Sequence, residues 1–437
     1  MKNKLLARRP IGNPRRLWRQ DVFLLNVSSP GPISLELKDE ITLKKTRRAV
    51  KTCYDAGFNA VGLLWASPEV GWEIVKTAEG LGLKVLYQNL KRFGGMGHSR
   101  IFCEENDLDG AITDTANWKS IMGYCLWDEP IVEEHLHKVH EMVELVEKRR
   151  PDLLPYTVAN PSDHRYCRFE DNAYIPYINR FLDVIDPAEM CFDHYPVGKP
   201  EYEPETQLDN TLMWCDLEVV RRAAQKRGIP FWFYYQAHRY HFHKKYYHFK
   251  HSMARSMAYA GVLHGAKALE CYLEFDGFID PATGGRGALF EEQKALNQEL
   301  RTIGGTLMAL TCLRVIHDDT LLPDCPYMEG LRTSMEESEL LGGELFPRIS
   351  VSEHEDDYGN KYLMVLNRDY DTPSHIRLTL KNNSNVYEVD KKDGEQKLLF
   401  HDSQYMIINL DPGDLRLYRI QDASEELYTV EYYLEKD

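Results

Sequence analysis

Long apolar runs are missing from this sequence, and so is a recognisable secretion signal. A membrane-spanning helix needs about 18 consecutive apolar residues, and no stretch of the 437 residues approaches that length. The first 19 residues carry seven lysines and arginines, but no apolar segment of about 7 to 15 residues follows them, as a secretory signal would require. We therefore expect a cytoplasmic protein without a membrane partner.

Cysteine pairs with the spacing of metal or redox motifs are also absent. The nine cysteines are scattered without a CxxC pair, and several lie inside apolar strand-like runs. This usage indicates reduced core thiols of an intracellular protein rather than disulfides or zinc ligands. His241 and His243 are close enough in sequence to chelate a metal, but no carboxylate or cysteine completes the set. We predict no metal site and favour an active-site loop here.

Positive charge is in deficit. The chain has 53 lysines and arginines against 68 aspartates and glutamates, a net charge of −15. Such a surface repels a phosphate backbone, so we expect no nucleic-acid partner. The glycine pairs at residues 94–95 and 284–285 are too isolated to indicate a phosphate loop, and we predict no cofactor. The sequence leaves a homo-oligomer open.

Alternating strand and helix patterns fill the first three quarters of the chain. The apolar runs span residues 21–28, 58–65, 83–89, 121–127, 155–160, 189–195, 230–236 and 266–273. Amphipathic helical patterns separate them, and one more, over residues 288–311, would close the ring. Eight alternations favour an α/β fold of the (β/α)₈ TIM-barrel type over a doubly wound sheet. We assign residues 21–325 to the barrel and residues 1–20 to a basic arm, which is more plausibly wrapped on the acidic domain than bound to a partner.

The pattern changes to period two from about residue 340. Short alternating runs are separated by turn residues such as Asn382-Asn383 and Asp393-Gly394. This is typical of antiparallel strands, and we predict a β-sandwich followed by an acidic tail over residues 326–437.

A barrel of this type gathers the carboxyl ends of its strands at one mouth, where its active site lies. The predicted strand ends carry carboxylates, amides and aromatic residues, which suit a neutral polyhydroxylated substrate. Aromatic faces cover the C–H surface of a sugar, and polar groups bind its hydroxyls. The expected substrate-binding residues are Asn26, Trp65, Asn89, Asn160, Asp193, Tyr195, Gln236 and His238.

Two adjacent carboxylates, Asp128 and Glu129, follow the fourth strand. They are costly to place at a strand end unless a substrate or a reaction uses them. We predict that Glu129 is a general acid and that Asp128 is catalytic or orients the substrate; the alternative is that both cap the following helix. Glu270 is a third catalytic candidate, with an ion pair to Lys267 or Arg255 as its alternative.

Several short motifs resemble those of clan A type glycoside hydrolases with a (β/α)₈ barrel. They are WDEP at residues 127–130, FDHYP at 192–196 and GVLHGAKALECYLEF at 261–275. KYLMVLNRDYDTP at 361–373 and PGDLRLYRI at 412–420 resemble the β-sandwich that often follows such barrels. The resemblance implies a glycosidase with Glu129 as acid/base. The family usually has Asn before this Glu and a nucleophilic Glu ending the seventh strand, where this chain has Asp128 and Gln236.

An amide cannot act as the nucleophile, so the second catalytic role needs another group. Glu270 or Asp193 could supply a carboxylate, either as a nucleophile or as the base of an inverting mechanism. The Asp-Glu pair also resembles that of substrate-assisted hexosaminidases, in which Asp128 would orient a 2-acetamido group. A carbohydrate-binding barrel without catalysis and, less plausibly, a metal-dependent hydrolase are the remaining alternatives. The expected substrate is a small oligosaccharide or glycoside.

Overall fold

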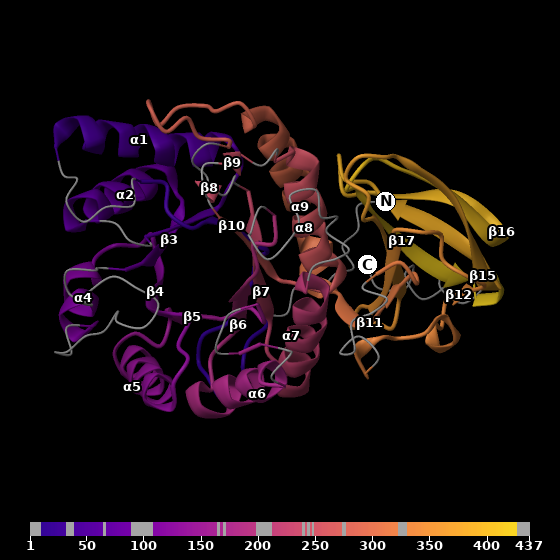
Figure 1. Cartoon of the computed structure of the whole chain (residues 1–437), viewed down its shortest axis with the longest axis horizontal. Helices are drawn as coiled ribbons and strands as arrows, with labels where there is room; N and C mark the ends of the chain where they lie inside the picture. The colour runs from indigo at the N-terminus through magenta and orange to yellow at the C-terminus, as the bar shows by residue number, and fades with distance from the viewer. Residues whose placement is uncertain are drawn as a thin grey trace, which may run out of the picture.

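The computed structural model describes residues 10–31, 39–63, 67–88, 108–163, 167–168, 172–197, 212–237, 241–242, 245–246, 249–272, 277–321 and 330–425. Within these ranges the chain forms a closed barrel and an antiparallel sheet. Helices α7, α8 and α9 lie between the barrel strands and that sheet (Figure 1). None of the helices in the described ranges is long and apolar enough to cross a membrane.

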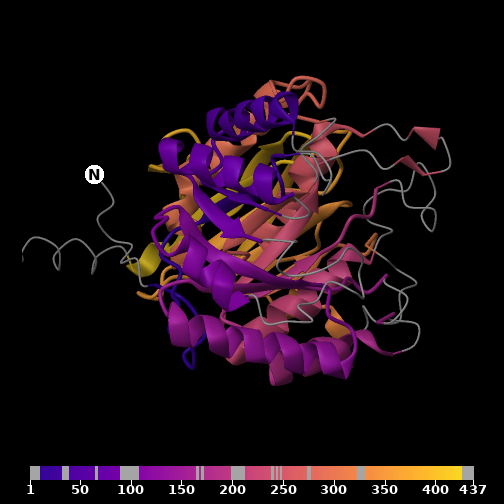
Figure 2. The same cartoon turned by 90° about the vertical axis from the view of Figure 1, so that its left-hand side faces the viewer.

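Eight parallel strands close the barrel in the order β1-β10-β7-β6-β5-β4-β3-β2, which confirms the predicted TIM barrel. The strands are β1 (Leu24–Val27), β2 (Ala60–Gly62), β3 (Lys84–Tyr87), β4 (Ile121–Asp128), β5 (Leu154–Ala159), β6 (Met190–Asp193), β7 (Phe231–Gln236) and β10 (Ala268–Tyr272). The helices are α1 (Glu40–Asp55), α2 (Pro68–Leu81), α4 (Leu108–Thr115), α5 (Glu133–Arg149), α6 (Tyr174–Ile185), α7 (Met213–Arg227), α8 (His251–Leu263) and α9 (Phe290–Ala309). A hairpin of β8 (His241–Phe242) and β9 (Lys245–Tyr246) follows β7 and projects beyond the barrel (Figure 2).

The helix ends follow local capping chemistry. Asp39 accepts a hydrogen bond from the Thr42 N–H at the start of α1, at 2.9 Å. Ser67 accepts one from the Val70 N–H at the start of α2, which has proline at its first position. Gly82 ends α2 at φ 74°, a conformation that glycine adopts without strain. These caps fix the start of α1 and both ends of α2.

The described part of the N-terminal arm closes the amino-terminal end of the barrel. The Trp18 ring contacts the Trp232 ring edge-on, with centroids 6.1 Å apart. The indole N–H of Trp232 donates to the side chain of Gln20 at 3.0 Å. Arg16, whose side chain is 5% exposed, pairs with Glu144 and Glu147 of α5. The barrel interior is therefore plugged at this end, and only the opposite end is left for a mouth.

The second sheet is a curled, antiparallel β-sandwich-like domain, as predicted. Its strands are β11 (Thr311–His317), β12 (Leu341–Gly342), β13 (Ile349–Glu355), β14 (Lys361–Asn367), β15 (Ser374–Val389), β16 (Gln396–Leu410) and β17 (Leu415–Asp422). β11 pairs with β13, so the sheet begins at residue 311 and not at the predicted boundary of 326. The turn predicted at Asn382-Asn383 is wrong as well. β15 runs through it and bends there by a shift of register against β16.

A buried ion cluster joins the two domains. Asp414 accepts hydrogen bonds from Arg255 of α8 at 2.6 Å and from Lys391 at 2.5 Å, and Lys391 also lies 3.0 Å from Glu299 of α9. Burial alone would raise the pKa of Asp414, but Lys391 and Arg255 hold it below its usual value. The neighbouring Gly413 packs so closely on α8 that an added Cβ would lie 2.5 Å from the Ser252 carbonyl oxygen. The two domains are therefore closely packed at this contact, and the buried charges there are paired.

Replacing Asp414 with alanine is expected to destabilise the protein by about 3 kcal/mol, the lower end for breaking a buried ion pair, because Arg255 and Lys391 would keep Glu299 as their only carboxylate partner in the described chain. Urea unfolding of the variant and the parent measures this. As a control, Lys397→Gln removes an exposed cation paired with Asp390 and Asp393 and should change the free energy of unfolding by less than about 1 kcal/mol. Equal effects of the two substitutions would contradict a stabilising role for the cluster.

Candidate active site

One row of inward-facing side chains crosses four neighbouring strands. Asn26 of β1 is in register with Glu270 of β10, Glu270 with Tyr234 of β7, and Tyr234 with Asp193 of β6. Register partners project from the same face of a sheet. The fold therefore brings together three of the predicted site residues, Asn26, Asp193 and Glu270. All four side chains are buried, and Asp193 retains the largest exposed fraction, 8%.

Glu270 is a carboxyl group of the barrel interior. The Asn26 amide donates a hydrogen bond to its Oε2. Burial raises the pKa of Glu270 to about 8, against the opposing effect of hydrogen bonds from Asn26 and Tyr234. The alternative of an ion pair is wrong. Lys267 donates to the Leu307 carbonyl oxygen at 2.5 Å, and Arg255 binds Glu299 and Asp414.

A β-bulge in β4 sets which side chains reach the mouth. Cys125 is in register with Tyr156, but Trp127 is in register with Thr157, so Leu126 is an extra residue on this strand. The bulge turns Trp127 outward, where its ring packs on His135 of α5 with centroids 4.7 Å apart. Asp128 instead comes into register with Val158, a residue of the inner core. Trp127 is thus a core residue, and Asp128 takes the inward position.

Glu129 adopts an unusual backbone conformation directly after β4. Its φ is 55°, in the left-handed region that non-glycine residues rarely adopt, and its N–H donates to the Val158 carbonyl oxygen at 3.0 Å. Such a conformation costs about 1–3 kcal/mol and is typical of functional sites. The side chain is 6% exposed. Helix α5 starts only at Glu133 with Val132 in the N-cap position, so neither Asp128 nor Glu129 occupies the N-cap.

Asn160, at the end of β5, is fixed beside the end of β4. The Tyr177 hydroxyl of α6 donates to the Pro130 carbonyl oxygen at 3.0 Å and accepts from the Asn160 backbone N–H at 3.1 Å. It also accepts from the Asn160 side-chain amide at 3.3 Å. Within the part of the chain that the structure describes, the Asn160 Oδ1 has no hydrogen-bond partner. A buried acceptor without a partner is unusual in a folded protein.

Gln236 bridges to the loop after β6. Its side-chain Nε2 donates to the Val197 carbonyl oxygen at 2.8 Å, and its Oε1 accepts from the Val197 N–H at 2.9 Å. Both ends of the amide are thus bonded to one backbone residue. Gln236 therefore holds this loop in place, a role that its amide explains.

Gln236→Glu is expected to give no gain of glycosidase activity over the parent and to destabilise the protein by about 1–3 kcal/mol. A carboxylate cannot donate to the Val197 carbonyl oxygen, and it leaves that acceptor unsatisfied. Chemical denaturation and a glycosidase assay measure the two effects, with Gln404→Glu as the control because the Gln404 amide is exposed. A gain of hydrolysis in the Gln236 variant would show that the position is a nucleophile site after all.

An aromatic pair lies beside Gln236. Tyr195, which follows β6, stacks on Tyr272 of β10 with ring centroids 4.6 Å apart and an interplanar angle of 22°. Both are partly exposed. Tyr272 was not among the predicted site residues, although it lies two residues after Glu270 and so on the same face of its strand. The pair offers a flat apolar surface near the polar row.

A buried histidine supports the end of β6 from behind. The His194 Nδ1 lies 2.6 Å from the Asp216 Oδ2 of α7, and that same oxygen accepts from the Ser162 N–H at 3.0 Å. Burial raises the pKa of Asp216. Sequence reasoning missed this pair because Asp216 lies on a helix far along the chain. By tying α7 to the residue after Asp193, the pair fixes the end of β6.

Three predicted binding residues, Trp65, Asn89 and His238, lie outside the described residues, as does His243. Among the described residues, no group of three histidine, cysteine or carboxylate side chains could hold a metal ion. A further buried carboxyl, Glu189, was not predicted. Burial and the nearby Glu270 raise its pKa well above the usual value.

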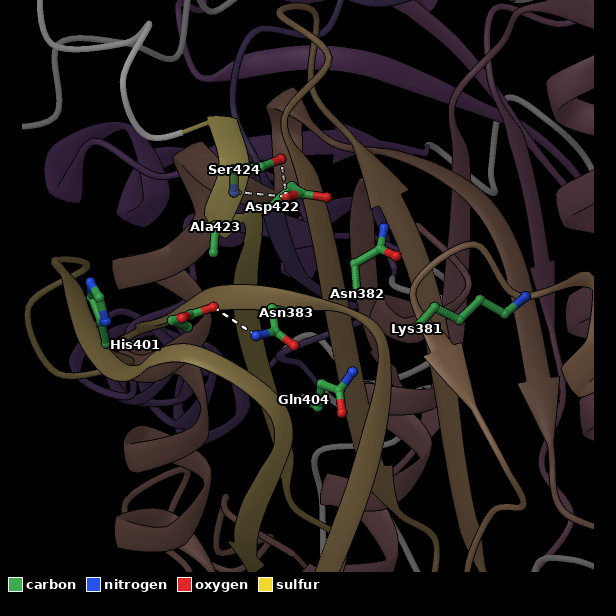
Figure 3. Close-up of a pocket in the computed structure, with 9 residues that line it drawn as sticks. Lys381, Asn382, Asn383, His401, Gln404, Asp422, Ala423 and Ser424 are labelled. Carbon is green, nitrogen blue, oxygen red and sulfur yellow. Dashed lines mark hydrogen bonds between the residues drawn. The ribbon is translucent and has the colours of Figure 1, made fainter.

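A polar hollow of about 590 Å³ lies on the C-terminal sheet (Figure 3). It is lined by Lys381, Asn382, Asn383, His401, Asp402, Gln404, Asp422, Ala423 and Ser424. Asn383 donates to Asp402 at 2.8 Å, and Ser424 donates to Asp422 at 2.6 Å. Phe, Tyr and Trp are missing from this lining, and most of its side chains are exposed. It lacks the flat apolar wall that a sugar ring needs, and the barrel mouth is the better candidate.

Comparison of sequences gives no match: no protein-family model matches the chain, and no curated protein matches it significantly. Solved structures do match. A candidate α-galactosidase from Bacteroides fragilis NCTC 9343 is similar with a TM-score of 0.54, over 92% of this chain and 79% of that chain, at 10% identity. The fold is that of barrel glycoside hydrolases. A β-L-arabinopyranosidase of glycoside hydrolase family 27 from Geobacillus stearothermophilus is similar with a TM-score of 0.50, over 92% of this chain and 97% of that chain, also at 10% identity. At this identity the likeness concerns the fold alone, and it covers both the barrel and the second sheet.

Proposed function

We propose that the protein hydrolyses an O-glycosidic bond of a small oligosaccharide or glycoside, with Glu129 as general acid/base. The observation that carries this proposal is the buried Glu129 held at φ 55° directly after β4, at the carboxyl-terminal end of a closed barrel. Barrel enzymes place their active sites at this end. A strained backbone conformation of this kind is expected where a side chain must be aimed at a substrate.

The second catalytic role suits Asp193 better than Glu270. A nucleophile or base must be ionised, and a carboxyl group with a pKa of about 8 is mostly protonated at neutral pH. Glu270 would instead donate a hydrogen bond or support Asn26 from within the barrel. Asp193 lies in the same row and is more exposed than Glu270. Its backbone is fixed because the next residue, His194, is bonded to Asp216 of α7.

Substrate assistance is the competing mechanism within the same proposal. The bulge in β4 aims Asp128 inward beside Glu129, as would be needed for Asp128 to orient a 2-acetamido group. Asn160, with its buried acceptor oxygen, and the Tyr195–Tyr272 pair would bind the sugar hydroxyls and its apolar face. Trp65, Asn89 and His238 remain further proposed contacts. The buried thiols of the seven described cysteines favour a cytoplasmic location.

A paired panel of 4-nitrophenyl glycosides tests the proposal. Each sugar is assayed both with a 2-hydroxyl group and with a 2-acetamido group at pH 5–8. Turnover of 2-hydroxy substrates supports a protein carboxylate such as Asp193 in the second role. Turnover restricted to 2-acetamido substrates supports Asp128 and substrate assistance. Absence of turnover across α and β anomers of the panel would contradict a glycosidase.

A carbohydrate-binding barrel without catalysis is the second candidate, and Gln236 favours it. This residue stands where the resembling family has its nucleophile, and its amide is engaged with Val197. Such a protein would bind sugars in calorimetry with no hydrolysis, and Glu129→Gln would leave that affinity nearly unchanged. Measurable turnover that depends on Glu129 rules this candidate out.

A further inference from the structure

A cavity lies at the amino-terminal end of the barrel, opposite the candidate active site. Its volume is about 600 Å³, within the range of small-molecule pockets. It is lined by residues that precede the strands, such as Asp21 and Val22 before β1 and Leu153 before β5, together with Lys84 and Ile121 at the starts of β3 and β4. Barrel enzymes have their active sites at the mouth, which is the other end of the barrel. A ligand in this cavity would therefore not be the substrate of the reaction proposed above.

The walls of this cavity combine aromatic and aliphatic surface. Trp18 of the N-terminal arm and Trp118, in the loop before β4, both line it, together with Leu24 and Ile121. Trp118 is held by Trp72 of α2, with ring centroids 5.8 Å apart, and Trp18 is held by Trp232. Two indoles fixed by other rings form rigid apolar walls, which suit a flat ring.

The cavity is also positively charged, although the protein as a whole carries a net charge of −15. Four basic residues line it, Arg19, Lys84, Lys119 and Arg150, against two acidic ones, Asp21 and Asp152. Basic side chains gathered in a cleft of an acidic protein concentrate small anions there.

Three of these cations, Arg150, Lys84 and Lys119, keep unused hydrogen-bonding capacity. Arg150 binds Asp152 through Nε and Nη2, at 3.2 and 3.1 Å, but its buried Nη1 has no hydrogen-bond partner in the described chain. Lys84 donates to the Lys119 carbonyl oxygen at 3.2 Å. For the Lys119 ammonium group, the described ranges provide neither a hydrogen bond nor an ion pair. The Arg150 Nη1 is closed off from the cavity, so the exposed ammonium groups of Lys84 and Lys119 are the donors that a ligand there can reach.

We propose that this cavity binds a small molecule that combines a flat apolar ring with one carboxylate or phosphate group. The ring lies between the indoles of Trp18 and Trp118, and the anionic group accepts from Lys119 and Lys84. The ligand bridges the N-terminal arm and the starts of β3, β4 and β5, so it stabilises the docked arm. This inference does not depend on the proposed glycosidase activity.

Isothermal titration calorimetry of the full chain with four probes tests the proposal. The probes are phenyl phosphate, benzoate, inorganic phosphate and phenol. If the cavity binds the ring and the anionic group together, phenyl phosphate or benzoate should bind with one-to-one stoichiometry. Its affinity should be about tenfold or more higher than that of inorganic phosphate or phenol, each of which has only one of the two groups. The comparison of phenyl phosphate with benzoate identifies the preferred anion.

Variants locate the binding. Lys119→Gln combined with Lys84→Gln should weaken the tighter aryl anion about tenfold, and Trp118→Leu should weaken the aryl anion but leave inorganic phosphate unchanged. Lys76→Gln, on the exposed side of α2, is the matched control and should have no effect. Thermal unfolding confirms that each variant folds. The proposal is overturned if the aryl anions bind no tighter than inorganic phosphate, or if the lysine pair and Lys76 have the same effect.

Discussion

Glu129→Gln is expected to slow the hydrolysis of an alkyl glycoside by about 10²- to 10⁴-fold, the usual contribution of a general acid. Glutamine keeps the size of the side chain and its hydrogen-bonding oxygen, but it cannot give a proton to the leaving oxygen. The Michaelis constant should change little, because the sugar contacts come from other strands. Steady-state kinetics on the best substrate of the glycoside panel measures the change in kcat.

The matched control is Glu134→Gln, five residues further on. Glu134 is an exposed carboxylate in the first turn of α5. Its substitution removes the same charge from nearly the same region and should leave kcat within a factor of two. If both variants were equally slow, the loss would come from charge near the mouth and not from an acid at Glu129. If neither were slow, Glu129 would not be the acid.

Glu270→Gln is expected to remove a large pH dependence from stability. Burial raises the pKa of Glu270 to about 8, from an ordinary value near 4.5. The native state therefore keeps a proton that the unfolded chain releases, and this group contributes stability below pH 4.5 that is lost as the pH rises to about 8. The full loss corresponds to about 5 kcal/mol. The glutamine variant has no such proton, so at pH 8 it should be several kcal/mol more stable than the parent.

Urea unfolding of both proteins between pH 4.5 and 8.5 measures this difference. Subtracting the two curves isolates Glu270 together with its electrostatic coupling to Glu189, whose pKa Glu270 raises. The difference should grow steadily with pH up to about 8. A difference that stays constant across the range would mean that Glu270 is ionised in the native state. Glu270 would then become a credible nucleophile, and Asp193 would lose its preference for the second role.

The barrel was predictable from the sequence because its strands are buried on both faces. Strands such as β5 (Leu154–Ala159) and β7 (Phe231–Gln236) are buried at every position, and such strands appear as continuous apolar runs separated by helical patterns. The prediction of the C-terminal sheet was less accurate. Asn382-Asn383 has the composition of a turn, yet the pairing of β15 with both β16 and β17 outweighs that local preference.

The details of the site depend on contacts that no local pattern contains. Strand alternation would place Trp127 on the same face as Cys125, and only the bulge at Leu126 puts Asp128 there instead. Gln236 was predicted to bind substrate, but its partner, Val197, lies 39 residues away in another loop. The place of Glu129 after the fourth strand and the WDEP resemblance led to its prediction as the acid, whereas its positive φ could not be foreseen in a residue that is not glycine.

The dependence of rate on leaving group tests the acid role of Glu129 most directly. Parent and Glu129→Gln proteins are compared on two glycosides of the same sugar. A 2,4-dinitrophenyl glycoside releases 2,4-dinitrophenolate, which leaves without a proton. A methyl glycoside releases methanol, and its leaving oxygen must be protonated. If Glu129 is the acid, the variant should hydrolyse the dinitrophenyl glycoside at close to the parent's rate for bond cleavage and lose the methyl glycoside almost completely. Equal losses on both substrates would contradict the assignment of Glu129 as the proton donor.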